Sequence, residues 1–188
     1  VTFNLAGSAL FLVAVALLYG VTGTLNMADL AERLPRLGAG NAALLQAAAL
    51  LLLVVFAVKA ALLPLYFWLP ETYAAASAPV AALFAIMTKV GVYSILRVYT
   101  LVFGSAAGPL EGLVHGWLWP LALLTLLAGL IGALAAQTLG MLVSYLVVVS
   151  VGTLTAGLAL GTVEALSASL YYLLHSTLIA AGLFLLVD

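Results

Sequence analysis

The hydrophobic residues of this chain fall in six long runs that are separated by short polar connectors. Each run is close to the ~20 residues that a helix needs to cross a hydrocarbon core of about 30 Å. Lipid offers backbone groups no hydrogen-bond partner, and the alternating strands typical of a membrane barrel are absent, so we expect helices. The predicted membrane spans cover residues 3–24, 41–69, 79–103, 117–136, 141–160 and 166–187.

The connectors contain most of the charged and turn-forming residues. Residues 26–36 hold the only charge cluster, and apolar residues recur there at helical spacing, which predicts a short helix at the membrane interface. A longer connector covers residues 104–116, and tight turns are expected at residues 137–140 and 161–164.

Composition rules out a soluble protein. Apolar residues make up 67% of the chain and charged residues 6%, whereas soluble domains have roughly 45–50% and about 25%. A soluble domain of about 150 residues buries only about 70% of the surface of its unfolded chain. A soluble enzyme, a disordered linker and, with a net charge of −1 and no basic stripe, a nucleic-acid binder are excluded. The chain is therefore predicted to be an all-α integral membrane protein with about six transmembrane helices.

Two further features concern the ends and the cysteines. The chain begins at Val1 rather than at methionine, and it ends at Asp188 directly after an apolar run. We therefore expect a central piece of a longer protein, incomplete at both ends. With no cysteine, disulfides, thiolate nucleophiles and cysteine-ligated metals are excluded. Metal-ligand spacing, a phosphate loop and a catalytic triad are also absent, so no metal site or cofactor is expected.

Three basic residues fall inside predicted spans. Lys59 lies deep in the second span, Lys89 near the middle of the third and His175 near the centre of the sixth. A charged lysine at a helix centre costs about 2.5–3.5 kcal/mol on insertion scales, so a functional role is the first hypothesis. The alternative is that each lysine reaches an interface along its aliphatic stem, but from mid-span that stem is too short.

No acidic residue falls in the middle of a predicted span, although buried charges are normally paired. We expect the carboxylates that pair with the lysines in segments beyond this sequence or in another subunit. A lysine withdrawn from water can gain or lose a proton near neutral pH as a carboxylate approaches or leaves, and histidine titrates there unaided. Lys59, Lys89 and His175 on facing helices would form a lateral proton relay, if water bridges them.

Several nearby residues could support this relay. Tyr171 lies one turn before His175 and Tyr172 lies three residues before it. Either could donate a hydrogen bond to the imidazole, but a packing role is equally consistent with their positions. Hydroxyl residues within the spans could hold water or simply bond their own backbone; these are Thr88, Ser144, Ser150, Thr153 and Ser176. Glu71, just past the second span, is a further candidate.

The second span contains a helix-breaking pattern. Pro64 removes the amide that would bond the Ala60 carbonyl, and Pro70 follows. A helix broken beside Lys59 would free backbone carbonyls and make room for water, as discontinuous helices do at the ion sites of transporters. The alternative is a packing kink, which is common in membrane helices. Because the lysine is one turn away, we favour the functional interpretation.

Three stretches of the sequence carry a resemblance to a known family: residues 56–73 (FAVKAALLPLYFWLPETY), 77–80 (SAPV) and 88–93 (TKVGVY). They resemble the proton-translocating antiporter-like subunits of respiratory complex I, membrane-bound hydrogenases and Mrp-type cation/proton antiporters. The nearest likeness is to the D-type subunit of the Mrp (Pha) antiporters. Complex I members usually have aspartate after Trp-Leu-Pro, whereas this chain has Glu71, which fits the Mrp branch better.

The resemblance implies a larger fold of about fourteen helices with two inverted repeats. Residues 1–103 would end the first repeat and residues 104–188 would begin the second. Lys59 matches the essential lysine of the broken helix, Lys89 the connecting lysine of the next helix, and His175 the histidine that continues the path. The family's glutamate on an earlier helix and its lysine or glutamate on a later broken helix are not in this sequence.

The resulting hypothesis is a subunit of a multisubunit Na⁺(K⁺)/H⁺ antiporter in a bacterial plasma membrane. It would be an ion transporter rather than an enzyme, and its partners would be the other subunits, the transported H⁺ and Na⁺ or K⁺, and the lipid bilayer. One alternative is a proton-pumping subunit of complex I or of a membrane hydrogenase. Another is a scaffold that only packs against other subunits.

Overall fold

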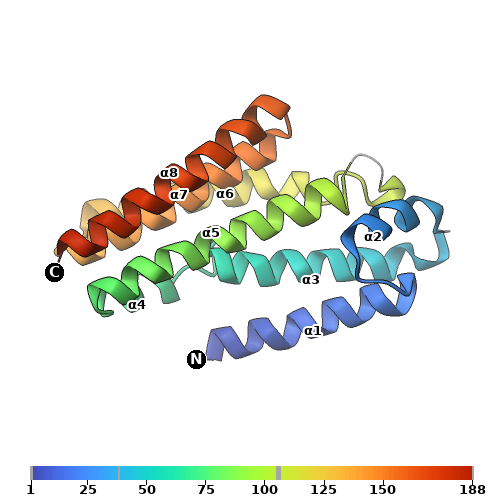
Figure 1. Ribbon diagram of the computed structural model, residues 1–188, viewed down its shortest axis with the longest axis horizontal. Coiled ribbons are helices and arrows are strands. Elements are labelled where there is room, and N and C mark those ends of the chain that lie inside the picture. Colours follow the sequence, from blue (N-terminus) through green and yellow to red (C-terminus); the bar gives the residue numbers. More distant parts are fainter. Residues whose placement is uncertain (1, 38, 105–106, 188) are drawn as a thin grey trace. The chain divides into compact units, whose positions relative to one another are not determined.

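The computed structural model describes residues 2–37, 39–104 and 107–187, so Val1 and Asp188 lie outside the described residues. Within these ranges, six helices are long and apolar enough to cross a membrane (Figure 1). This confirms the predicted all-α fold with six spans. The long helices are α1 (Thr2–Thr22), α3 (Ala42–Ala60), α5 (Ala78–Leu101), α6 (His115–Ala135), α7 (Leu139–Leu160) and α8 (Val163–Val187).

The shorter elements lie in the connectors and at the break in the second span. The second predicted span does not continue to residue 69: α3 ends at Ala60, and helix resumes only at α4. The peptide bond before Pro64, inside this interruption, is cis. The short elements are α2 (Met27–Arg33), α4 (Trp68–Ala74) and the 3₁₀ turns η1 (Leu34–Arg36), η2 (Ala39–Asn41) and η3 (Gly108–Leu110).

The chain forms two compact units, and each is described by itself. One comprises residues 1–56 and 93–116, and the other comprises residues 57–92 and 117–188. The second unit holds every residue that the sequence nominated for proton transfer, so the candidate site lies within it.

In the first unit, the charged connector forms the predicted short helix, α2. The Asn26 side chain caps α2 by accepting a hydrogen bond from the Ala28 amide at 3.0 Å. Arg33 pairs with Asp29 at 2.7 Å and also donates to the Thr22 carbonyl at 3.1 Å, which ties α2 to the end of α1. The hydrogen bond from Arg33 holds the pKa of the Asp29 carboxyl below its usual value.

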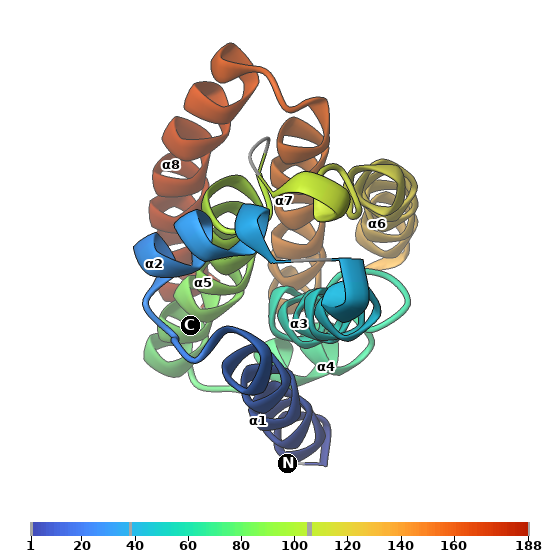
Figure 2. The ribbon, with the colours of Figure 1, turned by 90° about the vertical axis from the view of Figure 1, so that its right-hand side faces the viewer.

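In the second unit, α7 is the central helix, with α6 on one side and α8 on the other (Figure 2). Helix α7 begins at its cap, Thr138, whose side chain accepts from the Met141 amide at 3.2 Å. It ends at Gly161, whose φ of 66° closes the tight turn into α8. The predicted turn at residues 161–164 is therefore shorter than expected, because α8 already starts at Val163.

Helix α4 is held in place by an aromatic cluster around Tyr73. The Tyr73 hydroxyl donates to the Phe84 carbonyl of α5 at 2.6 Å. Its ring lies 6.1 Å from that of Phe184 on α8 and 6.1 Å from the Trp68 indole. Because α4 also packs on α7, the segment that follows the break is fixed against three long helices.

Candidate functional site

The break in the second span is built by a left-handed residue at the end of α3. The Leu62 amide donates to the Ala57 carbonyl at 2.9 Å and the Ala61 amide to the Val58 carbonyl at 3.3 Å. This is the paired pattern of a Schellman cap, with Ala61 at φ 59° where glycine is usual. The helix therefore ends at Ala60, and the predicted break near Pro64 is confirmed, since Pro64 lies within the interruption.

The next donors along the chain turn away from the helix. The Leu63 amide donates to the Thr125 hydroxyl of α6 at 3.0 Å instead of to the Lys59 carbonyl. Pro64 has no amide for the Ala60 carbonyl. The regular backbone hydrogen bonds of α3 therefore stop at Lys59, the residue that the sequence nominated for proton transfer.

Lys59 lies in the last turn of α3 and is half-buried. Its backbone lies directly against α5, because a Cβ atom built on Gly91 would be 2.7 Å from the Ala60 nitrogen and 3.0 Å from the Lys59 carbonyl carbon. No side chain fits at Gly91. Since Lys89 precedes Gly91 on the same helix, the two lysines belong to backbone segments in contact.

Lys89 is the most deeply buried ionisable residue of the predicted set, with 1% of its surface exposed. Its Nζ donates a hydrogen bond to the Ser150 Oγ of α7. The Ser150 hydroxyl in turn donates to the Val147 carbonyl at 2.7 Å. The amine therefore points into the protein, and the alternative in which Lys89 reaches a membrane interface is wrong.

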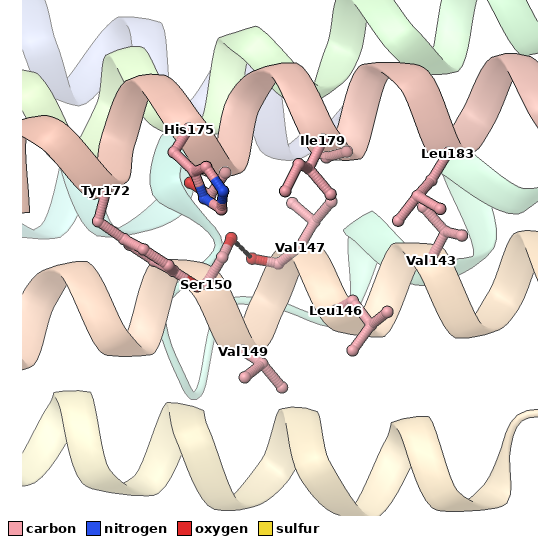
Figure 3. A pocket seen from close by; sticks show the side chains of 11 residues that line it. Val143, Leu146, Val147, Val149, Ser150, Tyr172, His175, Ile179 and Leu183 are labelled. Atoms are coloured by element: carbon pink, nitrogen blue, oxygen red, sulfur yellow. Dashed lines mark hydrogen bonds between the residues drawn. The ribbon is translucent and has the colours of Figure 1, made fainter.

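His175 lies on a pocket between α7 and α8 with a volume of about 180 Å³ (Figure 3). The imidazole points from α8 toward α7, above the Ser150 side chain. The pocket wall is mostly aliphatic, but it includes four polar side chains, those of Ser150, Tyr172, His175 and Ser176. A pocket of this size with several polar partners can hold water.

Of the predicted supporting residues Thr88, Tyr171 and Ser176 in the long helices, one lines the pocket and two do not. Ser176 lines the pocket and donates to the Leu173 carbonyl at 3.4 Å. Thr88 is fully buried and donates to the Ala85 carbonyl at 3.0 Å. Tyr171 is 75% exposed, and its ring stacks on the His175 ring at a centroid distance of 6.3 Å. Tyr172, not Tyr171, lines the pocket.

The two remaining nominated residues lie in α4. Glu71 is exposed in the first turn of this helix. Pro70 is buried beside it, at a first-turn position where a missing amide costs nothing. Pro70 therefore lies in the first turn of a helix, while the interruption itself surrounds Pro64.

Three residues that contribute to this site carried little signal in the sequence. Ser150 was one of several hydroxyls in apolar helices, and nothing local indicates that its partner is Lys89. Thr125 and Gly91 drew no attention, because the segments they contact are distant in sequence or fall in a neighbouring helix.

The left-handed conformation of Ala61 leads to a prediction about stability. Ala61 is fully buried, so Ala61→Val adds a β-branched side chain where neither φ nor space allows it, and we expect a loss of about 2–3 kcal/mol. Ala61→Gly should stay within about 1 kcal/mol of the parent, since relief of the backbone offsets a lost methyl group. Thermal unfolding of the purified proteins measures both, and equal effects of the two changes would contradict this account of the break.

Comparisons with known proteins identify the family of this chain. The model of the family described as NADH:quinone oxidoreductase/Mrp antiporter, transmembrane region, matches residues 1–188. A protein of Rhizobium meliloti (strain 1021), named as the probable D-type subunit of a K(+)/H(+) antiporter, is 49% identical over 100% of this chain and 35% of its own length. The D-type subunit of the Na(+)/H(+) antiporter of Bacillus subtilis (strain 168) is 42% identical over 99% of this chain and 37% of its own.

A solved structure supports the same assignment. A chain of the Mrp complex from Dietzia sp. DQ12-45-1b superposes with a TM-score of 0.83 at 33% identity, over 98% of this chain and 33% of that one. The present chain thus spans about a third of the length of the relatives it matches. It is a multi-pass membrane protein, and it belongs to the transmembrane family shared by the NADH:quinone oxidoreductases and the Mrp antiporters.

Proposed function

We propose that this chain is the central part of an antiporter subunit that exchanges protons for Na⁺ or K⁺ across a membrane. Protons would move laterally through Lys59, Lys89 and His175. Residues 1–103 would complete one repeat of the larger fold and residues 104–188 would begin the other. The remaining helices and the other subunits of the complex would supply the acidic groups and the cation path.

The observation that carries the proposal is the buried amine of Lys89. It has 1% exposure and donates a hydrogen bond to Ser150, which also lines the pocket with His175. Burying a charged lysine within a membrane span is energetically unfavourable, so such a residue is by default a candidate for a functional role. An amine connected to a polar pocket that holds an imidazole has the composition of a proton path, because amines and imidazoles can both accept and donate protons.

The names of the relatives support the choice of transported ions. The two bacterial relatives are named as antiporters of K⁺ and of Na⁺ against H⁺. The related solved structure is a complex. We therefore propose H⁺ and a monovalent cation as the transported species and further antiporter subunits as partners.

Lys59→Ala in the full-length protein, assembled with its other subunits, tests this function. We expect ΔpH-driven cation exchange in inside-out vesicles to fall on the order of a hundredfold, because a proton-transfer group contributes about 10²–10⁴ to a rate. Arg36→Ala, which removes an exposed charge from the connector after α2, is the matched control and should leave exchange unchanged. Unaltered exchange in Lys59→Ala would remove the proposal.

A second candidate function keeps the proton path but couples it to electron transfer. The family also includes subunits of NADH:quinone oxidoreductases. In that case, the assembled complex would move protons only when supplied with a reductant and a quinone. Exchange driven by an imposed ΔpH and a Na⁺ or K⁺ gradient, with no reductant present, distinguishes antiport from this alternative.

A further inference from the structure

Ser150 joins two parts of the site, the amine of Lys89 and the pocket that holds His175. Its side chain is 6% exposed. On one side, its oxygen accepts a hydrogen bond from the Lys89 amine of α5, a residue 61 positions away in the sequence. On the other side, it lines the pocket between α7 and α8, into which His175 points (Figure 3).

A serine hydroxyl has one proton to donate and two lone pairs that accept, and its proton can rotate. In the arrangement observed, Lys89 donates to the oxygen, and the hydroxyl proton goes to the Val147 carbonyl at 2.7 Å. This arrangement suits a protonated lysine. When the amine is neutral, its lone pair can accept, and the Ser150 proton can turn from Val147 toward it. The hydroxyl can then accept from the pocket in turn.

Resting on the proposed function, we propose that Ser150 relays protons between the pocket and Lys89. In the forward step, a pocket water that has taken a proton from His175 passes a proton to the Ser150 oxygen. In the same event, Ser150 gives its own proton to the neutral Lys89 amine. One O–H bond forms and one breaks at Ser150, so the serine is unchanged, His175 has lost a proton and Lys89 has gained it.

Other hydroxyls of the same helix lack this arrangement. Ser144 and Thr155 of α7 are also buried, and each donates to the carbonyl one turn earlier, Ser144 to Gly140 at 2.7 Å and Thr155 to Val151 at 2.8 Å. Neither lines the pocket. Ser144 therefore provides a matched control: it is the same residue type, on the same helix and at similar burial, but away from Lys89 and from the pocket.

The test compares two variants of nearly identical shape in the full-length protein within its complex. Ser150→Thr keeps the hydroxyl, whereas Ser150→Val replaces it with a methyl group. We expect ΔpH-driven exchange per assembled complex to stay within about threefold of the parent for the threonine variant and to fall about tenfold or more for the valine variant. Ser144→Ala should exchange at the parental rate.

Parental exchange in both the threonine and the valine variants would overturn the relay. If the added methyl group alone impairs both, Ser150→Ala decides: a tenfold loss there supports the relay and a parental rate overturns it. The result is also separable from the proposed function. Loss of exchange in Lys89→Met together with parental exchange in Ser150→Val would remove only the relay, whereas parental exchange in Lys89→Met would remove the proposed function itself.

Discussion

Lys89→Met is expected to abolish exchange while leaving the protein as stable as before or more stable. Methionine has nearly the length of lysine, is apolar and adapts to irregular space. We expect ΔpH-driven exchange to fall on the order of a hundredfold or more, because the residue that we propose as a proton carrier is lost. Removing a buried charge and replacing it with a well-packed apolar side chain is often neutral, or stabilising by about 1–4 kcal/mol.

The hydrogen bonds around Lys89 explain why Lys89→Met should not lower the stability of the protein. The amine donates to Ser150, but the proton of that hydroxyl is already accepted by the Val147 carbonyl. The substitution therefore leaves no buried donor without an acceptor at Ser150. A residue retained for structure would show the reverse behaviour, with lower stability and poorer assembly.

Two measurements check this prediction on the same purified complexes: thermal unfolding, and exchange after reconstitution into vesicles. Arg97→Met on the same helix is the control, because Arg97 is exposed and its loss should alter neither quantity. Impaired assembly with undiminished exchange per assembled complex would instead support the scaffold hypothesis.

The fold could be predicted from the sequence because membrane helices are specified locally. A run of apolar residues long enough to cross the bilayer is sufficient to predict a span, and all six predicted spans are helices in the described residues. The short helix α2 was also predictable, since both its cap and its apolar spacing lie within the same short stretch. The break in the second span was also predictable from Pro64, and only the residue at which its helix ends was not, because a buried alanine gives no termination signal.

The nominated site was predictable only as a set of residue types. Ionisable residues in apolar runs are conspicuous, so Lys59, Lys89 and His175 stood out without any structural knowledge. Their connections did not stand out, because the partners lie far away in the sequence: Ser150 is 61 residues from Lys89, and Thr125 is 62 residues from Leu63. A hydroxyl in an apolar helix usually bonds its own backbone, and Ser150 does that as well as bonding Lys89.

Gly91→Ala is expected to disrupt the candidate site, although Gly91 is not itself an ionisable residue. The added Cβ would lie 2.7 Å from the Ala60 nitrogen and 3.0 Å from the Lys59 carbonyl carbon, and both are backbone atoms that cannot rotate away. Helix α5 and the end of α3 must therefore separate. We expect a loss of at least about 2 kcal/mol of stability. Exchange should fall as well, since the contact that sets Lys59 against the helix of Lys89 is lost.

Gly182→Ala on α8 is the control that separates this contact from the general effect of a glycine in a helix. Apart from its chain neighbours and the adjacent backbone of α8, no described atom lies within 4 Å of a Cβ built at Gly182. Alanine there should therefore be neutral or should stabilise by about 0.5–1 kcal/mol through its better helix propensity. Thermal unfolding and ΔpH-driven exchange of the two variants give the comparison. If Gly91→Ala unfolds at the same temperature as Gly182→Ala and exchanges at the parental rate, then α5 and α3 do not touch at Gly91, and the two lysines do not belong to contacting segments. A loss in Gly91→Ala alone means that proton transfer at the break depends on backbone packing as well as on the amines, because the position of Lys59 is set by the one residue of α5 that has no side chain.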